Sequence, residues 1–145
     1  MNNKFAIVVS EFNANITDEL FNGAYHRLLE HGISEQDIYI ANVPGAVEIP
    51  LVAKLLAETG KYKAIICLGA VIRGDTDHYD YVCDQVSMGC QRVMLDYNLP
   101  VIFGVLTTNN MQQALDRVGG KEGHKGIYSA DAAIHMTALV AEITA

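Results

Sequence analysis

The chain has 145 residues, of which 50% are hydrophobic and 19% charged, and its mean hydropathy is +0.16. Charged residues make up about 25% of an average soluble domain, so the chain is apolar for its size. Disordered chains are poor in apolar residues, which excludes that class. The length predicts one domain over residues 1–145. The apolar excess then requires a membrane span, a well-filled core or a subunit interface.

The sequence predicts no membrane anchor. The longest apolar run, Ala64 to Ile72, has nine residues, whereas a membrane helix needs about 20. The opening segment MNNKFAIVVSEFN has one lysine and an apolar stretch that leads straight into polar residues, so we expect no signal peptide. We therefore expect a cytoplasmic protein.

Charge and residue counts exclude further classes. Ten basic against seventeen acidic residues give a net charge of −7, which leaves no broad basic surface for nucleic acid. Three cysteines without a CxxC pair indicate thiols in a reducing compartment. The five histidines show no HExxH or paired-ligand spacing, so we expect no metal site.

The first half of the chain alternates strand and helix patterns. Residues 4–10 are rich in β-branched residues and predict a buried strand. Asn15 offers an N-cap for a helix that runs to about residue 30. Residues 37–43 predict a second strand, and a second helix follows over about 47–59.

The second half continues the alternation. Residues 64–72 predict the most apolar strand, followed by a polar loop and a helix over about 77–97. Residues 100–106 predict a fourth strand. Thr108 or Asn109 then caps a short helix, and an alanine-rich helix covers about 125–143.

Strands that are each followed by a helix predict a parallel sheet with right-handed crossovers. The strands are apolar without alternation, which indicates a sheet covered by helices on both faces. We therefore expect a three-layer αβα fold with a central four-stranded parallel sheet. Ligands of such sheets bind beyond the carboxyl ends of the strands.

The segment Gly74-Asp75-Thr76 follows the third strand and precedes a helix. A helix start offers unpaired N–H groups and partial positive charge, which suit a phosphate or another anion. The carboxylate of Asp75 would repel phosphate, so we expect contact through the backbone. The chain has no P-loop and no GxGxxG fingerprint.

His78 falls in the first turn of the predicted third helix. A helix start disfavours a further positive charge, so the imidazole is available as a proton acceptor. The alternative interpretation is a surface histidine near a helix start.

Other residues near strand ends allow two interpretations each. Phe12 and Phe103 are placed where strands end and could stack on a planar ligand or pack in the core. Glu48 could accept hydrogen bonds from hydroxyl groups or simply favour a helix start. Arg117 and Lys125 belong to a basic patch that could bind phosphate or remain solvated.

Five segments together resemble the motif set of the 6,7-dimethyl-8-ribityllumazine synthase family, in order and spacing. They are SEFNANIT, VPGAVEIP, LGAVIRGDTDHYDYV, PVIFGVLTT and QALDRVGGKEGHKG. The resemblance implies a flavodoxin-like fold and a transferase of riboflavin biosynthesis without cofactor or metal. Its substrates would be 5-amino-6-(D-ribitylamino)uracil and 3,4-dihydroxy-2-butanone 4-phosphate, with phosphate and water released.

The resemblance also implies roles for individual residues. Phe12 would stack on the pyrimidine and Glu48 would hold ribityl hydroxyls. His78 would transfer protons. The other residues implied at the ribitylaminouracil pocket are Ala46, Val47, Ala70, Val71 and Ile72. The residues implied near the butanone phosphate are Asp75, Thr76, Arg117 and Lys125.

Phe103 and Arg117 resemble residues that reach the site from a neighbouring subunit, so the resemblance implies a homo-oligomer. Members of the family form pentamers, pairs of pentamers or sixty-subunit shells. The chain departs from the family pattern without losing a residue of proposed catalytic role. These departures are Asp77, Asp116, His124 and His135.

Two other functions remain open beside the synthase. A flavin- or pterin-binding module on this fold would bind riboflavin or a lumazine without turnover. A shell or scaffold protein would use only the assembly, but it would not need His78, Glu48 and Arg117 together. A receiver domain needs an acidic pair after the first strand, where Glu11 stands alone.

Overall fold

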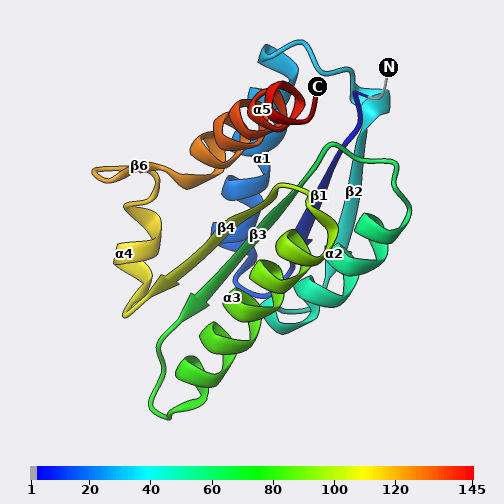
Figure 1. Cartoon of the computed structure of the whole chain (residues 1–145). Helices are drawn as coiled ribbons and strands as arrows, with labels where there is room; N and C mark the ends of the chain where they lie inside the picture. Colours follow the sequence, from blue (N-terminus) through cyan, green and yellow to red (C-terminus); the bar gives the residue numbers. More distant parts are fainter. Residues whose placement is uncertain (1–2) are drawn as a thin grey trace.

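Four apolar segments form one parallel sheet in the computed structural model, which describes residues 3–145 (Figure 1). The strands are β1 (Phe5–Ser10), β2 (Ile38–Val43), β3 (Ala64–Ile72) and β4 (Val101–Thr108). Their order is β2-β1-β3-β4, and every neighbouring pair is parallel. The predicted four-stranded parallel sheet is confirmed.

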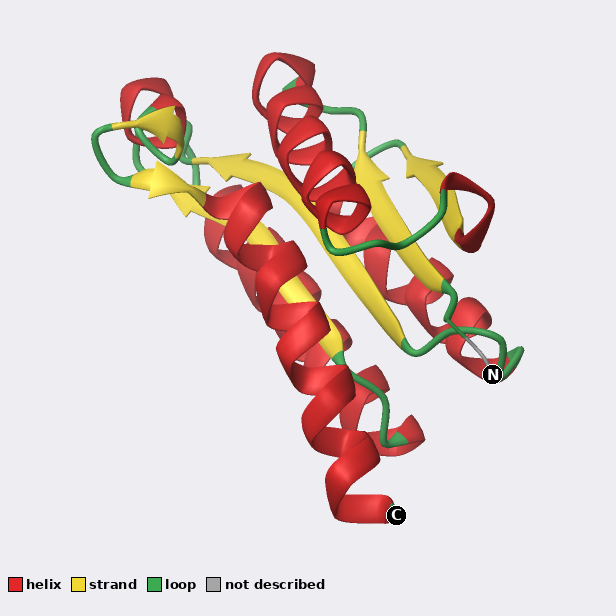
Figure 2. Ribbon diagram, turned by 90° about the horizontal axis from the view of Figure 1, so that it is seen from above, coloured by secondary structure: helices red, strands yellow, loops and turns green. Residues whose placement is uncertain are grey.

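Helices cover both faces of this sheet, which confirms the three-layer prediction (Figure 2). The helices are α1 (Ala14–Glu30), α2 (Ile49–Glu58), α3 (His78–Tyr97), α4 (Met111–Leu115) and α5 (Lys125–Thr144). Helices α1 and α5 pack on one face, and α2 and α3 pack on the other. Short 3-10 turns precede β2 and α2, at Glu35–Asp37 and Ala46–Glu48. No helix within residues 3–145 is both long and apolar enough to span a membrane.

The alternation of side chains along β1 divides the core into two clusters. Phe5, Ile7 and Val9 face α1 and α5, whereas Ala6 and Val8 face α2 and α3. All of these side chains are buried. The continuous apolar runs of the sequence therefore reflect a sheet that is covered on both sides.

Three helices begin elsewhere than the sequence predicts. Helix α1 begins at Ala14, so Asn15 lies inside the helix and is not its cap. A 3-10 turn occupies the predicted start of the second helix, and α2 begins only at Ile49, with Pro50 in its first turn. Asn110 caps α4, since its side chain accepts a hydrogen bond from Gln113 N. Single-residue caps are resolved by local geometry that a sequence pattern does not encode.

The glycine-rich turn forms a small hairpin that the sequence did not predict. Its strands are β5 (Val118–Gly120) and β6 (Gly123–His124). His124 then caps α5, because its Nδ1 accepts from the backbone N–H groups of Gly126 and Ile127 at 3.1 and 3.3 Å. Partial burial lowers the pKa of His124, which favours the neutral ring that this cap requires.

A charged cluster joins α1 to α5. Asp131 Oδ1 lies 2.8 Å from both Arg27 Nε and His31 Nε2. The hydrogen bond from Arg27, followed by the one from His31, holds the pKa of the Asp131 carboxyl below its ordinary value of 3.8. Folding therefore favours the ionised carboxylate, and this contribution to stability is complete above pH 3.8.

We expect Asp131→Asn to lower the melting temperature modestly near neutral pH, because the cluster is partly exposed to solvent. The difference from the parent chain should shrink as the pH falls below 3.8, where the carboxylate takes up its proton. Thermal unfolding at a series of pH values measures this. A difference that stays constant across that range would contradict the assignment.

Candidate active site

The carboxyl edge of the sheet is stepped, because β3 extends beyond β1. Strand β1 pairs with β3 only as far as Leu68, whereas β4 follows β3 to Ile72. The last residues of β3 therefore have a strand neighbour on one side only. The step leaves room for a pocket between the end of β3 and the ends of β1 and β2.

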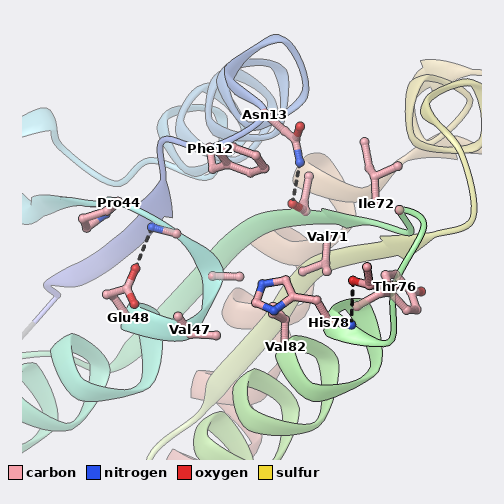
Figure 3. A pocket seen from close by; sticks show the side chains of 15 residues that line it. Phe12, Asn13, Pro44, Val47, Glu48, Val71, Ile72, Thr76, His78 and Val82 are labelled. Carbon is pink, nitrogen blue, oxygen red and sulfur yellow. Dashed lines mark hydrogen bonds between the residues drawn. The ribbon is translucent and has the colours of Figure 1, made fainter.

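The turn after β1 bridges this step and places Phe12 over the pocket. Glu11 N donates to Val43 O at 2.8 Å, and Phe12 N donates to Pro44 O at 3.0 Å. On the other side, Asn13 Nδ2 donates to Ala70 O at 3.0 Å (Figure 3). Asn13 adopts a left-handed conformation with φ 63°, which asparagine tolerates better than most residues. The side chain of Phe12 is 70% exposed, so it is free to contact a ligand.

The resulting pocket has a volume of about 470 Å³, within the range of small-molecule sites. It brings together nine of the residues expected at the site. They are Phe12, Ala46, Val47, Glu48, Ala70, Val71, Ile72, Thr76 and His78. Most of its lining is apolar, and few polar groups converge on it (Figure 3). Such a surface suits a planar ring with polar substituents.

The 3-10 turn before α2 positions Glu48. Its Oε1 accepts a hydrogen bond from Gly45 N at 2.9 Å, which fixes the carboxylate at the rim of the pocket (Figure 3). A carboxylate oxygen has more than one lone pair, so Glu48 retains capacity for further donors. The group can therefore accept hydrogen bonds from the hydroxyls of a ligand.

The start of α3 positions His78. Its backbone N–H donates to Thr76 Oγ1 at 3.3 Å, and both residues are exposed. Figure 3 shows the imidazole of His78 directed into the pocket. The helix start provides the backbone N–H groups and partial positive charge that an anion requires.

Four of the expected site residues do not line this pocket. They are Asp75, Phe103, Arg117 and Lys125. Asp75 is exposed in the loop between two lining residues, Gly74 and Thr76. Arg117 Nη1 donates to Gln113 O at 2.9 Å, and Lys125 N donates to Arg117 O at 2.7 Å. Arg117 and Lys125 are therefore neighbouring residues, at the junction of α4, the hairpin and α5.

Phe103 corrects one prediction, since it does not lie where a strand ends. It is the third residue of β4, opposite Cys67 of β3, and it packs half-buried against the cluster under α2 and α3. The fourth strand runs to Thr108 and not to Leu106, so its carboxyl end lies farther along the chain.

Sequence reasoning missed two lining residues of consequence, Asn13 and Tyr79. The repeated asparagines in SEFNAN signal a turn but do not show which of them enters the left-handed conformation. The ring of Tyr79 lies against Arg73, with 4.3 Å between the guanidinium carbon and the ring centroid. Burial raises the pKa of the Tyr79 phenol above its ordinary value of 10.0.

Fold and site define a class of protein. A doubly wound parallel sheet with a mainly apolar pocket at its carboxyl edge, and a histidine at a helix start beside it, is typical of an α/β enzyme acting on small molecules. No group of three or more His, Cys, Asp or Glu side chains among residues 3–145 could hold a metal ion.

The comparisons with known proteins narrow the class to one family. A family model described as 6,7-dimethyl-8-ribityllumazine synthase matches residues 2–141. Two proteins named 6,7-dimethyl-8-ribityllumazine synthase, from Coxiella burnetii strains CbuG_Q212 and RSA 493 / Nine Mile phase I, are each 57% identical over 140 residues. Each alignment covers 97% of this chain and 93% of the relative. The chain belongs to the 6,7-dimethyl-8-ribityllumazine synthase family.

Proposed function

We propose that the pocket at the carboxyl edge of the sheet is the site where this chain makes 6,7-dimethyl-8-ribityllumazine. Membership of the family, together with 57% identity over nearly the whole chain, makes the protein a transferase of riboflavin biosynthesis. The substrates are 5-amino-6-(D-ribitylamino)uracil and 3,4-dihydroxy-2-butanone 4-phosphate, and phosphate and water are released. The observation that carries the assignment of the site is the convergence of Phe12, Glu48 and His78 on one cavity.

The pyrimidine substrate fits the apolar part of the pocket. Its ring stacks on the exposed face of Phe12, and the end of β3, at Ala70 to Ile72, borders the ring. The ribityl chain extends towards Glu48, beside Ala46 and Val47, where the carboxylate accepts hydrogen bonds from hydroxyl groups.

The phosphate substrate lies at the start of α3. Joining an amine to a ketone requires protons to move from the amine to the leaving water, and His78 is the titratable side chain beside that point. Loss of phosphate builds negative charge, which the hydroxyl of Thr76 and the N–H groups after Asp75 stabilise. The reaction needs no metal or cofactor in this scheme.

We also propose that the site is completed by a second copy of the chain. Arg117 and Lys125 lie together but outside the pocket of their own chain, and Phe103 is half-buried on the side of α3. Large apolar side chains are exposed on α2, α3 and α5, as at Leu51 and Met88, and they need a partner surface. A pentamer, a pair of pentamers or a sixty-subunit shell would cover them.

Size-exclusion chromatography with light scattering tests the assembly. A species of at least five times 15.8 kDa is expected, and a monomer that is active would contradict the shared site. We propose a cytoplasmic location, which three free cysteines support.

The function itself is tested by incubation with both substrates. The formation of a fluorescent lumazine together with inorganic phosphate is expected. Tight binding of the lumazine without turnover would instead identify a binding module. If the chain shows neither binding nor turnover, the scaffold hypothesis would be the one that remains.

We expect Phe12→Ala to raise the KM for the ribitylaminouracil by roughly tenfold, since a stacked aromatic pair contributes about 0.5–1.5 kcal/mol beyond area burial. The melting temperature should not fall, because the ring is 70% exposed. Steady-state kinetics measure the change, with Phe12→Tyr as the matched variant that keeps the ring. Equal KM values for Phe12→Ala and Phe12→Tyr would remove Phe12 from the site.

A further inference from the structure

We infer that Arg73 is a positioning residue that holds the first turn of α3, and with it His78, in place for proton transfer. The inference rests on the proposed function and adds to it a residue outside the pocket lining. It is carried by the set of contacts that Arg73 makes at the end of β3.

Arg73 connects three segments that meet at the rim of the site. Its backbone N–H donates to Thr108 O at 2.9 Å, which extends the pairing of β3 with β4 by one residue. Its Nε donates to Asn109 Oδ1 at 3.2 Å, in the turn that follows β4. Its Nη2 donates to Asp80 Oδ1, also at 3.2 Å, in the first turn of α3.

The guanidinium also lies on the ring of Tyr79, with 4.3 Å to the ring centroid. Tyr79 and Asp80 directly follow His78 in the chain. One side chain therefore fixes the two residues next to the proposed proton carrier, and it anchors them to the end of the sheet.

His78 depends on such an anchor because it is the first residue of α3. It is exposed, and apart from the hydrogen bonds within α3, its backbone N–H donates to Thr76 Oγ1 at 3.3 Å. The preceding residues, 74–77, are exposed as well. The place of the imidazole is therefore set by where α3 begins. A displacement of about 1 Å in a catalytic group can cost a hundredfold in rate.

A direct role of Arg73 in binding phosphate fits the contacts less well. Its guanidinium already donates to Asn109 and Asp80 and stacks on Tyr79. The carboxylate of Asp80 also offsets its charge, so the group offers little to an incoming anion. Arg73→Lys would keep the charge but could not make the two directed contacts and the stacking together.

The decisive test is the effect of Arg73→Gln in two backgrounds. In the otherwise unchanged chain, we expect kcat to fall about 10- to 100-fold while the KM of each substrate changes less than about twofold. In a His78→Ala background the same substitution should change kcat less than about twofold, because no imidazole remains to be positioned. An equal loss in both backgrounds, or a raised KM for the butanone phosphate alone, would overturn the inference.

A second readout does not depend on turnover. Hydrogen–deuterium exchange of the peptide covering residues 73–82 should be faster in Arg73→Gln and in the milder variant Asp80→Asn. Arg92→Gln is the matched control, since Arg92 lies on the same helix, is 83% exposed and pairs only with the nearby Asp96 among the described residues. It should change neither the exchange of that peptide nor the kinetics.

The two measurements separate failure of this inference from failure of the proposed function. Unchanged exchange in Arg73→Gln would show that Arg73 does not hold the helix start, whatever the activity. A chain that makes no lumazine before any substitution would overturn both the proposed function and the role of Arg73 in it.

Discussion

His78→Ala is expected to lower kcat by roughly 100- to 10,000-fold, which is the usual contribution of a positioned acid or base. His78 lines the pocket at the start of α3, where the amine and the ketone would meet. Its side chain is exposed and packs in neither core cluster, so the melting temperature should not fall. Binding of the ribitylaminouracil should change less than about twofold, because the ring stacks elsewhere in the pocket.

The measurement is steady-state kinetics beside a binding titration on the same preparation. His135→Ala is the matched control, since His135 is also an exposed histidine, on α5 and away from the pocket lining. A kcat for His78→Ala within about threefold of the parent chain would remove His78 from proton transfer and leave phosphate loss and proximity as the source of the rate.

Gly126→Ala is expected to cost about 2–3 kcal/mol of folding stability and to lower the melting temperature by roughly 5–10 °C. Gly126 lies in the first turn of α5, where the backbone of α1 passes close by. A Cβ at this position would lie 2.3 Å from Leu20 O and 3.0 Å from Leu20 C. Backbone atoms cannot turn away as a side chain can, so α1 and α5 would have to separate.

Thermal unfolding measures this cost. Gly74→Ala is the matched control, because a Cβ there would meet nothing within 4 Å. If Gly126→Ala were as stable as Gly74→Ala, the close approach of α1 and α5 would be wrong. The packing of α1 against α5 also fixes the position of the hairpin between α4 and α5. Arg117 and Lys125 lie at the two ends of this hairpin, and we propose that they reach the site of a neighbouring copy.

Strands β1 and β3 could be predicted from sequence because nearly all of their residues are buried, whereas β2 lies at the edge of the sheet and is buried only at its two ends. A run such as residues 64–72 can satisfy its backbone and its apolar side chains only inside a covered sheet. The edge at which ligands bind follows from the parallel topology. The sequence therefore also predicted that Phe12 and His78 lie beside that edge.

The details that were missed depend on contacts between distant segments. Asn13 takes a left-handed conformation and donates to Ala70, 57 residues away along the chain. Nothing in the local sequence distinguishes it from Asn15. The sequence prediction that Phe103 lies where a strand ends is wrong, because Phe103 pairs with Cys67 well before the end of β4 and the register with β3 carries β4 to Thr108. The contacts of Arg73 likewise appear only when β4 and α3 are brought together.

The apolar composition is divided between the core and the surface. Both faces of the sheet are filled by buried side chains. Large apolar side chains are nevertheless exposed, such as Met88 on α3 at 71% and Ile143 on α5 at 72%. These residues belong to the surfaces that we propose to lie between subunits.

A crystal structure with the ribitylaminouracil bound would show whether the pocket between Phe12, Glu48 and His78 holds the substrates. We expect the pyrimidine ring to stack on Phe12, a ribityl hydroxyl to lie within hydrogen-bond distance of the Glu48 carboxylate, and His78 to lie beside the reacting amine. A ligand bound elsewhere on the protein, with this pocket empty, would contradict this assignment of the site.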